Sequence, residues 1–285
     1  MPVMGAARQR QVHRQLERKG SQVTIVAVDL TLEGKVAVVT GGSRGIGLGI
    51  AQSFAEAGAA VMLVSRKPEG LEAAASDITR ASPGSEVAWH AGHVGRMDDA
   101  EACMEATLDR FGAVDILVNN AATNPYAGPT IGVDPARLDK TYEVNLRGPL
   151  LWSQVAWNRY MHDHGGVIIN IAAGGAYTTS SQLGVYCMFK AALVHLTKQL
   201  AAELGPNVRV NCIAPGLIKT DFARILWEGD RGAKVASGLP LQRLGEASDI
   251  GDASVWLAAN ATWMTGQTIV LDGGGLVRFL EERDE

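Results

Sequence analysis

Two side chains that can exchange protons stand four residues apart in this sequence, at Tyr186 and Lys190. On a helix, positions i and i+4 share a face, so the phenol and the ammonium group can project into one cleft. A nearby cation favours the phenolate, and we expect Lys190 to lower the pKa of Tyr186 toward the range needed for proton exchange with an alcohol or a ketone. Such pairs also occur by chance on exposed helices, so the meaning of this one depends on the rest of the chain.

A glycine-rich turn near residue 40 is suited to binding phosphate. The segment from Thr40 to Gly47 reads Thr-Gly-Gly-Ser-Arg-Gly-Ile-Gly, and it lies between an apolar run at 35–40 and a helical apolar period that extends to Gly58. Such glycines let the backbone approach a phosphate, and the N-terminus of the following helix adds N–H donors and a partial positive charge. At the start of a strand–helix–strand unit, this turn predicts a dinucleotide site.

The end of the next apolar run, 60–64, indicates which dinucleotide. A site for NAD carries an acidic residue there, which binds the ribose 2′-hydroxyl. This sequence has Ser65-Arg66-Lys67 instead, and Arg66 together with Arg44 can clamp a 2′-phosphate. We therefore predict a preference for NADP(H) over NAD(H). The alternative is that Arg66 and Lys67 begin a solvated helix.

Apolar runs and helical stretches alternate along the chain. The predicted strands are 35–40, 60–64, 87–91, 115–119, 167–171, 208–213 and 268–271. Right-handed crossovers give an α/β fold, a single Rossmann-type doubly wound domain whose seven-stranded parallel sheet has the order 3-2-1-4-5-6-7 and helices on both faces. Ligands bind at the carboxyl ends of such strands, where Asn120 and Pro215-Gly216 stand. Asn145 falls inside a predicted helix, where an amide has poor propensity and needs a reason.

Composition limits the class of protein. The 285 residues are 47% hydrophobic with 33 glycines, which suits one large domain, and the net charge of −4 gives no reason to expect nucleic acid. Cys103, Cys187 and Cys212 are widely spaced, with no histidines at metal-ligand spacing, so we predict a cytoplasmic protein without a metal site. Since no apolar run reaches about 18 residues, we expect no membrane partner.

The two ends of the chain differ from its middle. Five basic residues and only two acidic ones lie between Arg8 and Asp29. We interpret 1–30 as a basic, flexible or short helical arm, the alternative being a targeting segment. The catalytic domain is then expected at 31–280. A charged tail follows at 281–285, and it lacks the peroxisomal Ser-Lys-Leu ending.

From about residue 32 to 277, the sequence resembles a classical short-chain dehydrogenase/reductase. The resemblance rests on the glycine turn, Asn-Asn-Ala at 119–121, Asn145, Tyr186-x-x-x-Lys190 and Pro215-Gly216. Within that family, segments 120–125, 214–220, 226–227, 243–246 and 265–266 resemble tetrameric NADPH-dependent carbonyl reductases that act on retinal and aromatic ketones. The chain is more distantly similar to 3-oxoacyl-ACP reductases.

The resemblance implies a role for each matching residue. Tyr186 would be the general acid, Lys190 would bind the nicotinamide ribose and tune Tyr186, and Asn145 would hold a water of the proton relay. The implied cofactor contacts, from the phosphates through the adenosine end to the nicotinamide end, are Gly41, Ser43, Arg44, Gly45, Ile46, Gly47, Ser65, Arg66, His93, Val94, Asn120, Ala121, Pro215, Gly216, Ile218 and Thr220.

We predict a substrate lid at about 217–240. Phe222, Leu226 and Trp227 suggest an apolar cover over the site, but an apolar helix packed on the core or on a subunit neighbour would give the same sequence pattern. Similar enzymes pair the helices near 150–161 and 186–200 across a two-fold axis. We therefore predict a homotetramer, with a dimer as the alternative.

Two positions depart from the family pattern. His93 stands where the family has an aspartate that binds adenine, so adenine affinity is expected to fall unless backbone contacts suffice. The family's catalytic serine lies 13 residues before the tyrosine, at 186 − 13 = 173, and this chain has Ala173. Loss of one donor to a developing oxyanion costs about 10²–10³ in rate, which predicts a slowed enzyme. The loop hydroxyls at 178–181 are either substitutes or turn residues.

Three functions remain open on the sequence alone. The first is an NADP(H)-dependent oxidoreductase that transfers a hydride to or from a ketone, an aldehyde or a 3-oxoacyl substrate. The second is an enoyl- or dienoyl-thioester reductase, since relatives of that kind can lack the serine. The third is a catalytically impaired, NADP-binding sensor or scaffold, although Tyr186, Lys190 and Asn145 are all retained.

Overall fold

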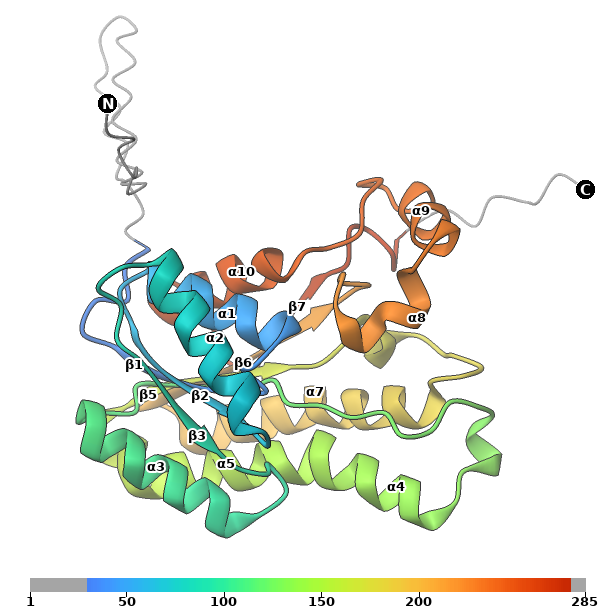
Figure 1. The fold of residues 1–285 in the computed structure, drawn as a ribbon. Helices are drawn as coiled ribbons and strands as arrows, with labels where there is room; N and C mark the ends of the chain where they lie inside the picture. Colours follow the sequence, from blue (N-terminus) through green and yellow to red (C-terminus); the bar gives the residue numbers. More distant parts are fainter. Residues whose placement is uncertain (1–29, 278–285) are drawn as a thin grey trace, which may run out of the picture.

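A seven-stranded parallel sheet forms the centre of the molecule (Figure 1). The structure, a computed structural model, describes residues 30–277. The predicted tail at 281–285 lies outside the described residues, and so does the predicted arm at 1–30 except for residue 30. The strands follow the order β3-β2-β1-β4-β5-β6-β7, which confirms the predicted topology. Their bounds are β1 Val36–Thr40, β2 Ala60–Ser65, β3 Val87–Ala91, β4 Ile116–Asn119, β5 Gly166–Ile171, β6 Val208–Pro215 and β7 Thr268–Leu271.

Helices cover both faces of the sheet (Figure 1). One face carries α1 Gly45–Glu56, α2 Pro68–Ala81 and α10 Ala247–Ala259, and the other carries α3 Met97–Phe111, α5 Gly148–Ala156 and α7 Gly184–Leu204. Shorter helices and turns complete the described chain: η1 Thr130–Gly132, α4 Pro135–Tyr142, η2 Glu143–Arg147, η3 Trp157–Met161, α6 His162–His164, η4 Gly174–Tyr177, η5 Asp221–Ala223, α8 Arg224–Trp227 and α9 Asp230–Ser237.

Two apolar cores hold these layers together, one on each side of the sheet. Every residue of β1 is buried, and successive side chains alternate between the cores, with Val39 in the core under α1 and Val38 in the core over α5. Phe54 anchors the first core and Trp152 the second, both fully buried. The indole of Trp152 also donates a hydrogen bond of 3.1 Å to the carbonyl of Val94, which fixes the loop after β3 to α5.

This packing corrects the reasoning behind the predicted tetramer. The sequence predicts that the apolar residues of the helices near 150–161 and 186–200 exceed what packing on one sheet face requires, namely Leu151, Trp152, Val155, Tyr160, Leu193, Leu196 and Leu200. In the structure Trp152, Val155, Leu193 and Leu200 are buried within the chain, at 6% exposure or less, and the other three are partly buried. Packing on the chain's own sheet therefore explains the four buried residues, which provide no surface for a partner.

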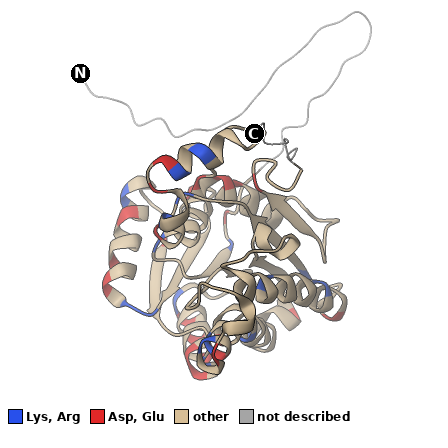
Figure 2. Ribbon diagram, turned by 90° about the vertical axis from the view of Figure 1, so that its right-hand side faces the viewer, with Lys and Arg blue, Asp and Glu red and all other residues tan. Residues whose placement is uncertain are grey.

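The surface of the described residues carries both signs of charge. Figure 2 shows basic and acidic positions interspersed along the helices. Between residues 30 and 277, no helix combines the length and the hydropathy needed to cross a membrane.

Candidate active site

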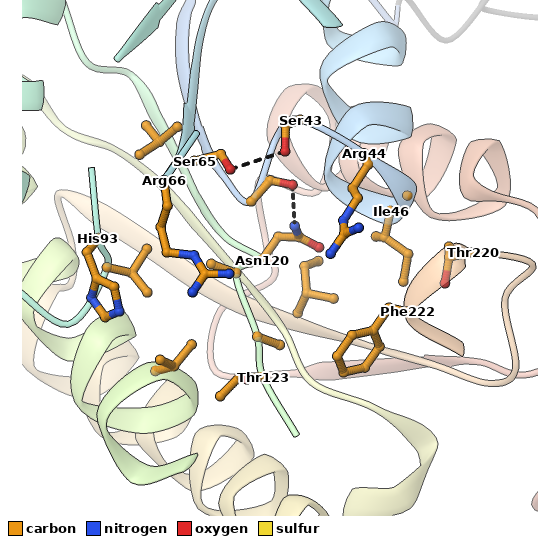
Figure 3. Close-up of a pocket in the computed structure, with 18 of the residues that line it drawn as sticks. Ser43, Arg44, Ile46, Ser65, Arg66, His93, Asn120, Thr123, Thr220 and Phe222 are labelled. Atoms are coloured by element: carbon orange, nitrogen blue, oxygen red, sulfur yellow. Dashed lines mark hydrogen bonds between the residues drawn. The ribbon is translucent and has the colours of Figure 1, made fainter. Parts of the chain in front are cut away.

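A cavity at the carboxyl ends of the strands collects most of the predicted site residues (Figure 3). Its walls come from the turn after β1, the ends of β2, β3, β4 and β5, helix α7 and the segment after β6. The predicted residues that line it are Gly41, Ser43, Arg44, Gly45, Ile46, Ser65, Arg66, His93, Val94, Asn120, Ala121, Tyr186, Lys190, Thr220 and Phe222. The topology thus brings the Tyr186–Lys190 pair and the glycine turn into one cleft.

Seven predicted residues lie outside this lining. Gly47 packs beneath the glycine turn, since a Cβ there would lie 2.3 Å from the Gly41 carbonyl oxygen. Ile218 is 4% exposed and pairs with Gly245 in a short parallel bridge. The remaining five are Asn145, Pro215, Gly216, Leu226 and Trp227. Trp227 is nevertheless tied to the cavity wall, because its indole donates to the Thr220 carbonyl at 2.9 Å.

The glycine turn has the geometry of a phosphate cradle. Gly41 has φ +67°, and a Cβ there would lie 2.7 Å from Nδ2 of Asn120. Gly45, which begins α1, has φ +58°, and a Cβ there would lie 3.2 Å from Cγ2 of Thr220. No side chain caps the N-terminus of α1, and its first turn contains no acidic residue, so its N–H groups remain available to an anion. These residues fit the phosphates of a dinucleotide.

Hydrogen bonds between β1 and β4 hold this turn in place. Asn120 Nδ2 donates to the Thr40 carbonyl at 2.9 Å and to the Gly41 carbonyl at 3.3 Å. The Thr40 hydroxyl donates to the Val118 carbonyl and accepts the backbone N–H groups of Asn120 and Ala121 at 3.0 and 3.2 Å. Asn120 and the buried Thr40 therefore fix the turn to the sheet.

The catalytic pair has the predicted arrangement, but the predicted effect on the tyrosine pKa is wrong. Lys190 is 1% exposed, and its Nζ lies 5.6 Å from the centre of the Tyr186 ring. Its ammonium group donates to the Ile171 carbonyl at 2.7 Å. Burial lowers the pKa of Lys190 to about 8, whereas burial, followed by the nearby Cys187, raises the pKa of Tyr186. Desolvation of the phenolate is the largest cause of this rise, and Lys190 does not reverse it, so Tyr186 stays protonated at neutral pH.

Asn145 occupies a π-helical turn, which explains an amide inside a helix. Its Oδ1 accepts the Thr123 N–H at 2.8 Å, and its Nδ2 donates to the Thr123 carbonyl at 2.8 Å. The side chain is fully buried and does not face the cavity. It therefore fixes the backbone of Thr123, which does line the cavity, and the predicted water of a proton relay stays a prediction.

The segment around Ala173 contains no hydroxyl that replaces the family serine at the cavity wall. Ala173 follows β5, and a Cβ on Gly175 in the adjacent turn would lie 2.7 Å from Sγ of Cys187, so this turn packs against the start of α7. The Ser180 hydroxyl accepts the N–H groups of Gln182 and Leu183 at 3.3 and 3.0 Å. Ser180 is thus a turn residue, and none of the side chains at 178–181 is part of the cavity lining.

Cationic side chains face the cavity between the phosphate cradle and the end of β2. Arg44 and Arg66 reach into it from opposite walls (Figure 3). Within residues 30–277, neither guanidinium forms an ion pair with a carboxylate. The Ser43 hydroxyl donates to the Ser65 hydroxyl at 3.2 Å, which places two further polar groups beside the arginines.

Sequence reasoning missed part of the wall. The additional lining residues are Val64, Gly92, Ala122, Thr123, Lys140, Val144, Ile171, Ala172 and Asp221. Lys140 and Val144 stand four apart where α4 runs into η2 and so share one face, but no motif marked that face as part of the site. The others are neighbours of predicted residues at strand ends.

Comparisons with known proteins agree with this geometry. The family model described as enoyl-(acyl carrier protein) reductase matches residues 41–275. Dehydrogenase/reductase SDR family member 4 from Sus scrofa is 39% identical over 251 residues, covering 87% of this chain and 89% of the relative.

Two solved structures show the same fold. A short-chain type dehydrogenase/reductase from Mycobacterium ulcerans superposes with a TM-score of 0.82 at 31% identity, over 87% of this chain and 92% of that one. A 7α-hydroxysteroid dehydrogenase, in complex with NADH and 7-oxo glycochenodeoxycholic acid, gives 0.81 at 31% identity, over 87% and 96%.

A doubly wound sheet with a phosphate cradle and a tyrosine–lysine pair in one cleft defines a nicotinamide-dependent oxidoreductase. The chain belongs to the short-chain dehydrogenase/reductase family. Its reaction is hydride transfer between a nicotinamide cofactor and a carbonyl or alcohol substrate.

Proposed function

We propose that this protein is an NADP(H)-dependent reductase of ketones, aldehydes or 3-oxoacyl groups, and that it works in the cytoplasm. The observation that carries the proposal is the shared cavity, which Tyr186 and Lys190 line together with Arg44 and Arg66, two arginines that form no ion pair within residues 30–277. Three free, buried cysteines, Cys103, Cys187 and Cys212, agree with a reducing compartment.

The chain's own residues have separate tasks in this reaction. The glycine turn and the N-terminus of α1 bind the phosphates, and when bound the nicotinamide supplies the hydride. Tyr186, which is protonated at neutral pH and whose pKa burial raises further, donates its proton to the substrate oxygen. Lys190, held by Ile171, keeps positive charge beside the phenol. The Phe222 ring lies 6.3 Å from that of Tyr186 and provides an apolar wall for the substrate.

A substrate screen tests this proposal. NADPH consumption would be measured with ketones, quinones, aldehydes and 3-oxoacyl thioesters, and turnover of at least one carbonyl compound is expected. Binding of NADPH without turnover of any carbonyl or alkene would instead identify the catalytically impaired, NADP-binding alternative.

Reduction of a carbon–carbon double bond is a second candidate function. The absence of a hydroxyl at Ala173 favours this function. In a conjugated thioester, the carbon that accepts the hydride lies away from the carbonyl oxygen, which is the atom that a hydroxyl at this position would contact. This function is favoured also by the description of the matching family model. Loss of absorbance of an enoyl thioester under NADPH, with simple ketones left untouched, would select it over carbonyl reduction.

Replacing Arg66 with aspartate should reverse the cofactor preference. The wild type is expected to bind NADPH more tightly than NADH, because a charge-assisted contact to the 2′-phosphate contributes about 1.5–3 kcal/mol. Arg66→Asp repels that phosphate, so the ratio of the two dissociation constants should shift toward NADH by at least about tenfold. Fluorescence titration of both cofactors measures the ratio.

Lys67→Asp makes the matched control, since it changes the neighbouring charge at a residue that is not part of the cavity lining. It should leave the ratio within about twofold of wild type. Equal affinity of the wild type for NADPH and NADH would contradict the assignment of Arg66.

The proposed assembly is a homotetramer, with a dimer as the alternative. The residues that support association are exposed ones, not the buried residues of α5 and α7. Trp263, just before β7, is fully exposed, Trp256 of α10 is 39% exposed, and Met188 of α7 is 53% exposed. Aromatic residues and methionine are enriched in protein–protein interfaces. Light scattering at micromolar concentration should give four chains, and a monomer would contradict association.

A further inference from the structure

The cavity ends, beyond the two arginines, in a corner built by His93 and Lys140. His93 follows β3, Lys140 lies on α4, and both line the cavity. Nζ of Lys140 is 2.9 Å from Nε2 of His93. On its other side, the imidazole Nδ1 is 3.0 Å from the backbone nitrogen of Gly95, whose N–H points to it.

This pair contains more hydrogen-bond donors than acceptors. A neutral imidazole has one N–H and one lone pair. If Nδ1 accepts from Gly95, the proton lies on Nε2 and faces the Lys140 ammonium; if Nε2 accepts from Lys140, the proton lies on Nδ1 and faces the Gly95 N–H. Every tautomer leaves two donors facing each other, and a protonated ring leaves two such conflicts.

The neighbouring charges do not relieve the excess. Glu143 accepts from Lys140 at 2.8 Å, but its other oxygen already accepts from Arg147 at 3.2 Å. Asp99 accepts the backbone N–H of His93 at 2.7 Å. Burial, Lys140, Arg66 and Arg96 together lower the pKa of His93, while Glu143 raises it. The corner is therefore rich in N–H donors, with its carboxylates already occupied.

The position of the corner identifies the part of a dinucleotide that would reach it. The nicotinamide must lie beside Tyr186, and the phosphates must lie at the glycine turn and the α1 N-terminus. His93 lies at the opposite end of the cavity from Thr220 and Phe222 (Figure 3). Arg66, at the end of β2, lies between, where the ribose 2′ position is recognised in this fold. The base is the part that remains.

We propose that His93 and Lys140 read the purine base of the cofactor as hydrogen-bond donors, and so favour a base whose edge presents an acceptor. Beside its N7 acceptor, adenine carries a 6-amino donor, which adds a donor to a site that already has too many, whereas a 6-oxo purine carries acceptors at both N7 and O6. The inference rests on the proposed dinucleotide site. It predicts that a dinucleotide with hypoxanthine binds at least as tightly as the same dinucleotide with adenine.

Four dinucleotides test this inference by binding alone. Dissociation constants would be measured by protein fluorescence for NADPH, NADH and the hypoxanthine form of each. The wild type should bind each hypoxanthine form at least as tightly as its adenine counterpart. Lys140→Met should weaken the hypoxanthine forms relative to the adenine forms by about tenfold, the value of one charged hydrogen bond, with or without the 2′-phosphate.

Two further variants and a control sharpen the result. His93→Asp replaces a donor by an acceptor and should shift the preference toward adenine, while Lys140→Arg keeps a donor and should retain the wild-type preference. Lys198→Met, an exposed change on α7 away from the cavity lining, should alter neither ratio. Circular dichroism checks that each variant is folded.

Each contrary outcome has a definite meaning. Adenine bound at least about tenfold more tightly than hypoxanthine by the wild type would overturn the inference. So would a Lys140→Met variant that changes only the ratio of NADPH to NADH, because Lys140 would then serve the 2′-phosphate. Equal affinity for NADPH and NADH, with the hypoxanthine preference intact, would overturn only the proposed cofactor choice. Failure to bind all four would overturn both.

Discussion

Carbonyl reduction by the Tyr186→Phe variant is expected to fall at least about 10³-fold below wild type. The change removes the proton donor of the reaction, a role that contributes about 10²–10⁴ in rate, and it removes a donor to the developing negative charge on the substrate oxygen. Ala173 provides no second hydroxyl that could donate to this oxygen. The measurement is kcat/KM for the best carbonyl substrate with saturating NADPH.

The affinity for NADPH separates a chemical defect from a structural one. Phenylalanine keeps the ring that lies 5.6 Å from the Lys190 amine, so the dissociation constant of NADPH should stay within about threefold of wild type. Tyr177→Phe is the matched control, since it removes a hydroxyl from a tyrosine that is 48% exposed and is not part of the cavity lining. Its activity should be that of the wild type. Undiminished turnover by Tyr186→Phe would show that proton transfer does not pass through this phenol.

The pKa of Tyr186 marks a limit of sequence reasoning. Spacing alone predicted that Tyr186 and Lys190 share one cleft, because helix geometry fixes which residues lie on one face. The direction of the pKa shift depends also on how much water reaches each group, and a sequence does not give this. Lys190 turned out to be held by the Ile171 carbonyl at the end of a different element, and burial decided the balance.

The fold was more accessible to prediction than the details of the site. All seven strands were predicted within two residues of their observed ends, because strands buried on both faces read as continuous apolar runs between turns. Lys140 was not predicted as a site residue, since its partner His93 is 47 residues away and their contact depends on how α4 packs beside the end of β3. The role of Asn145 was also inaccessible, because the Thr123 backbone that it binds lies 22 residues before it.

The second large effect is a gain of rate from a single hydroxyl. Ala173→Ser is expected to raise carbonyl reduction by up to about 10²-fold, because a donor to the developing oxyanion contributes about 10²–10³. The position is partly exposed at the end of β5, where the backbone is extended, so serine requires no change of conformation. The gain should appear in kcat, with the dissociation constant of NADPH nearly unchanged.

The control for Ala173→Ser adds the same hydroxyl nearby but outside the site. Ala176 lies three residues farther along the same turn and away from the position of the family serine, so Ala176→Ser should leave the rate at the wild-type value. An unchanged rate for Ala173→Ser on every ketone, together with NADPH-dependent reduction of an enoyl thioester, would contradict carbonyl reduction and select the second candidate function. The reason is that an added donor accelerates only a reaction that develops charge on an oxygen within its reach. The two rates thus decide whether the missing serine slows a carbonyl reductase or suits a different substrate.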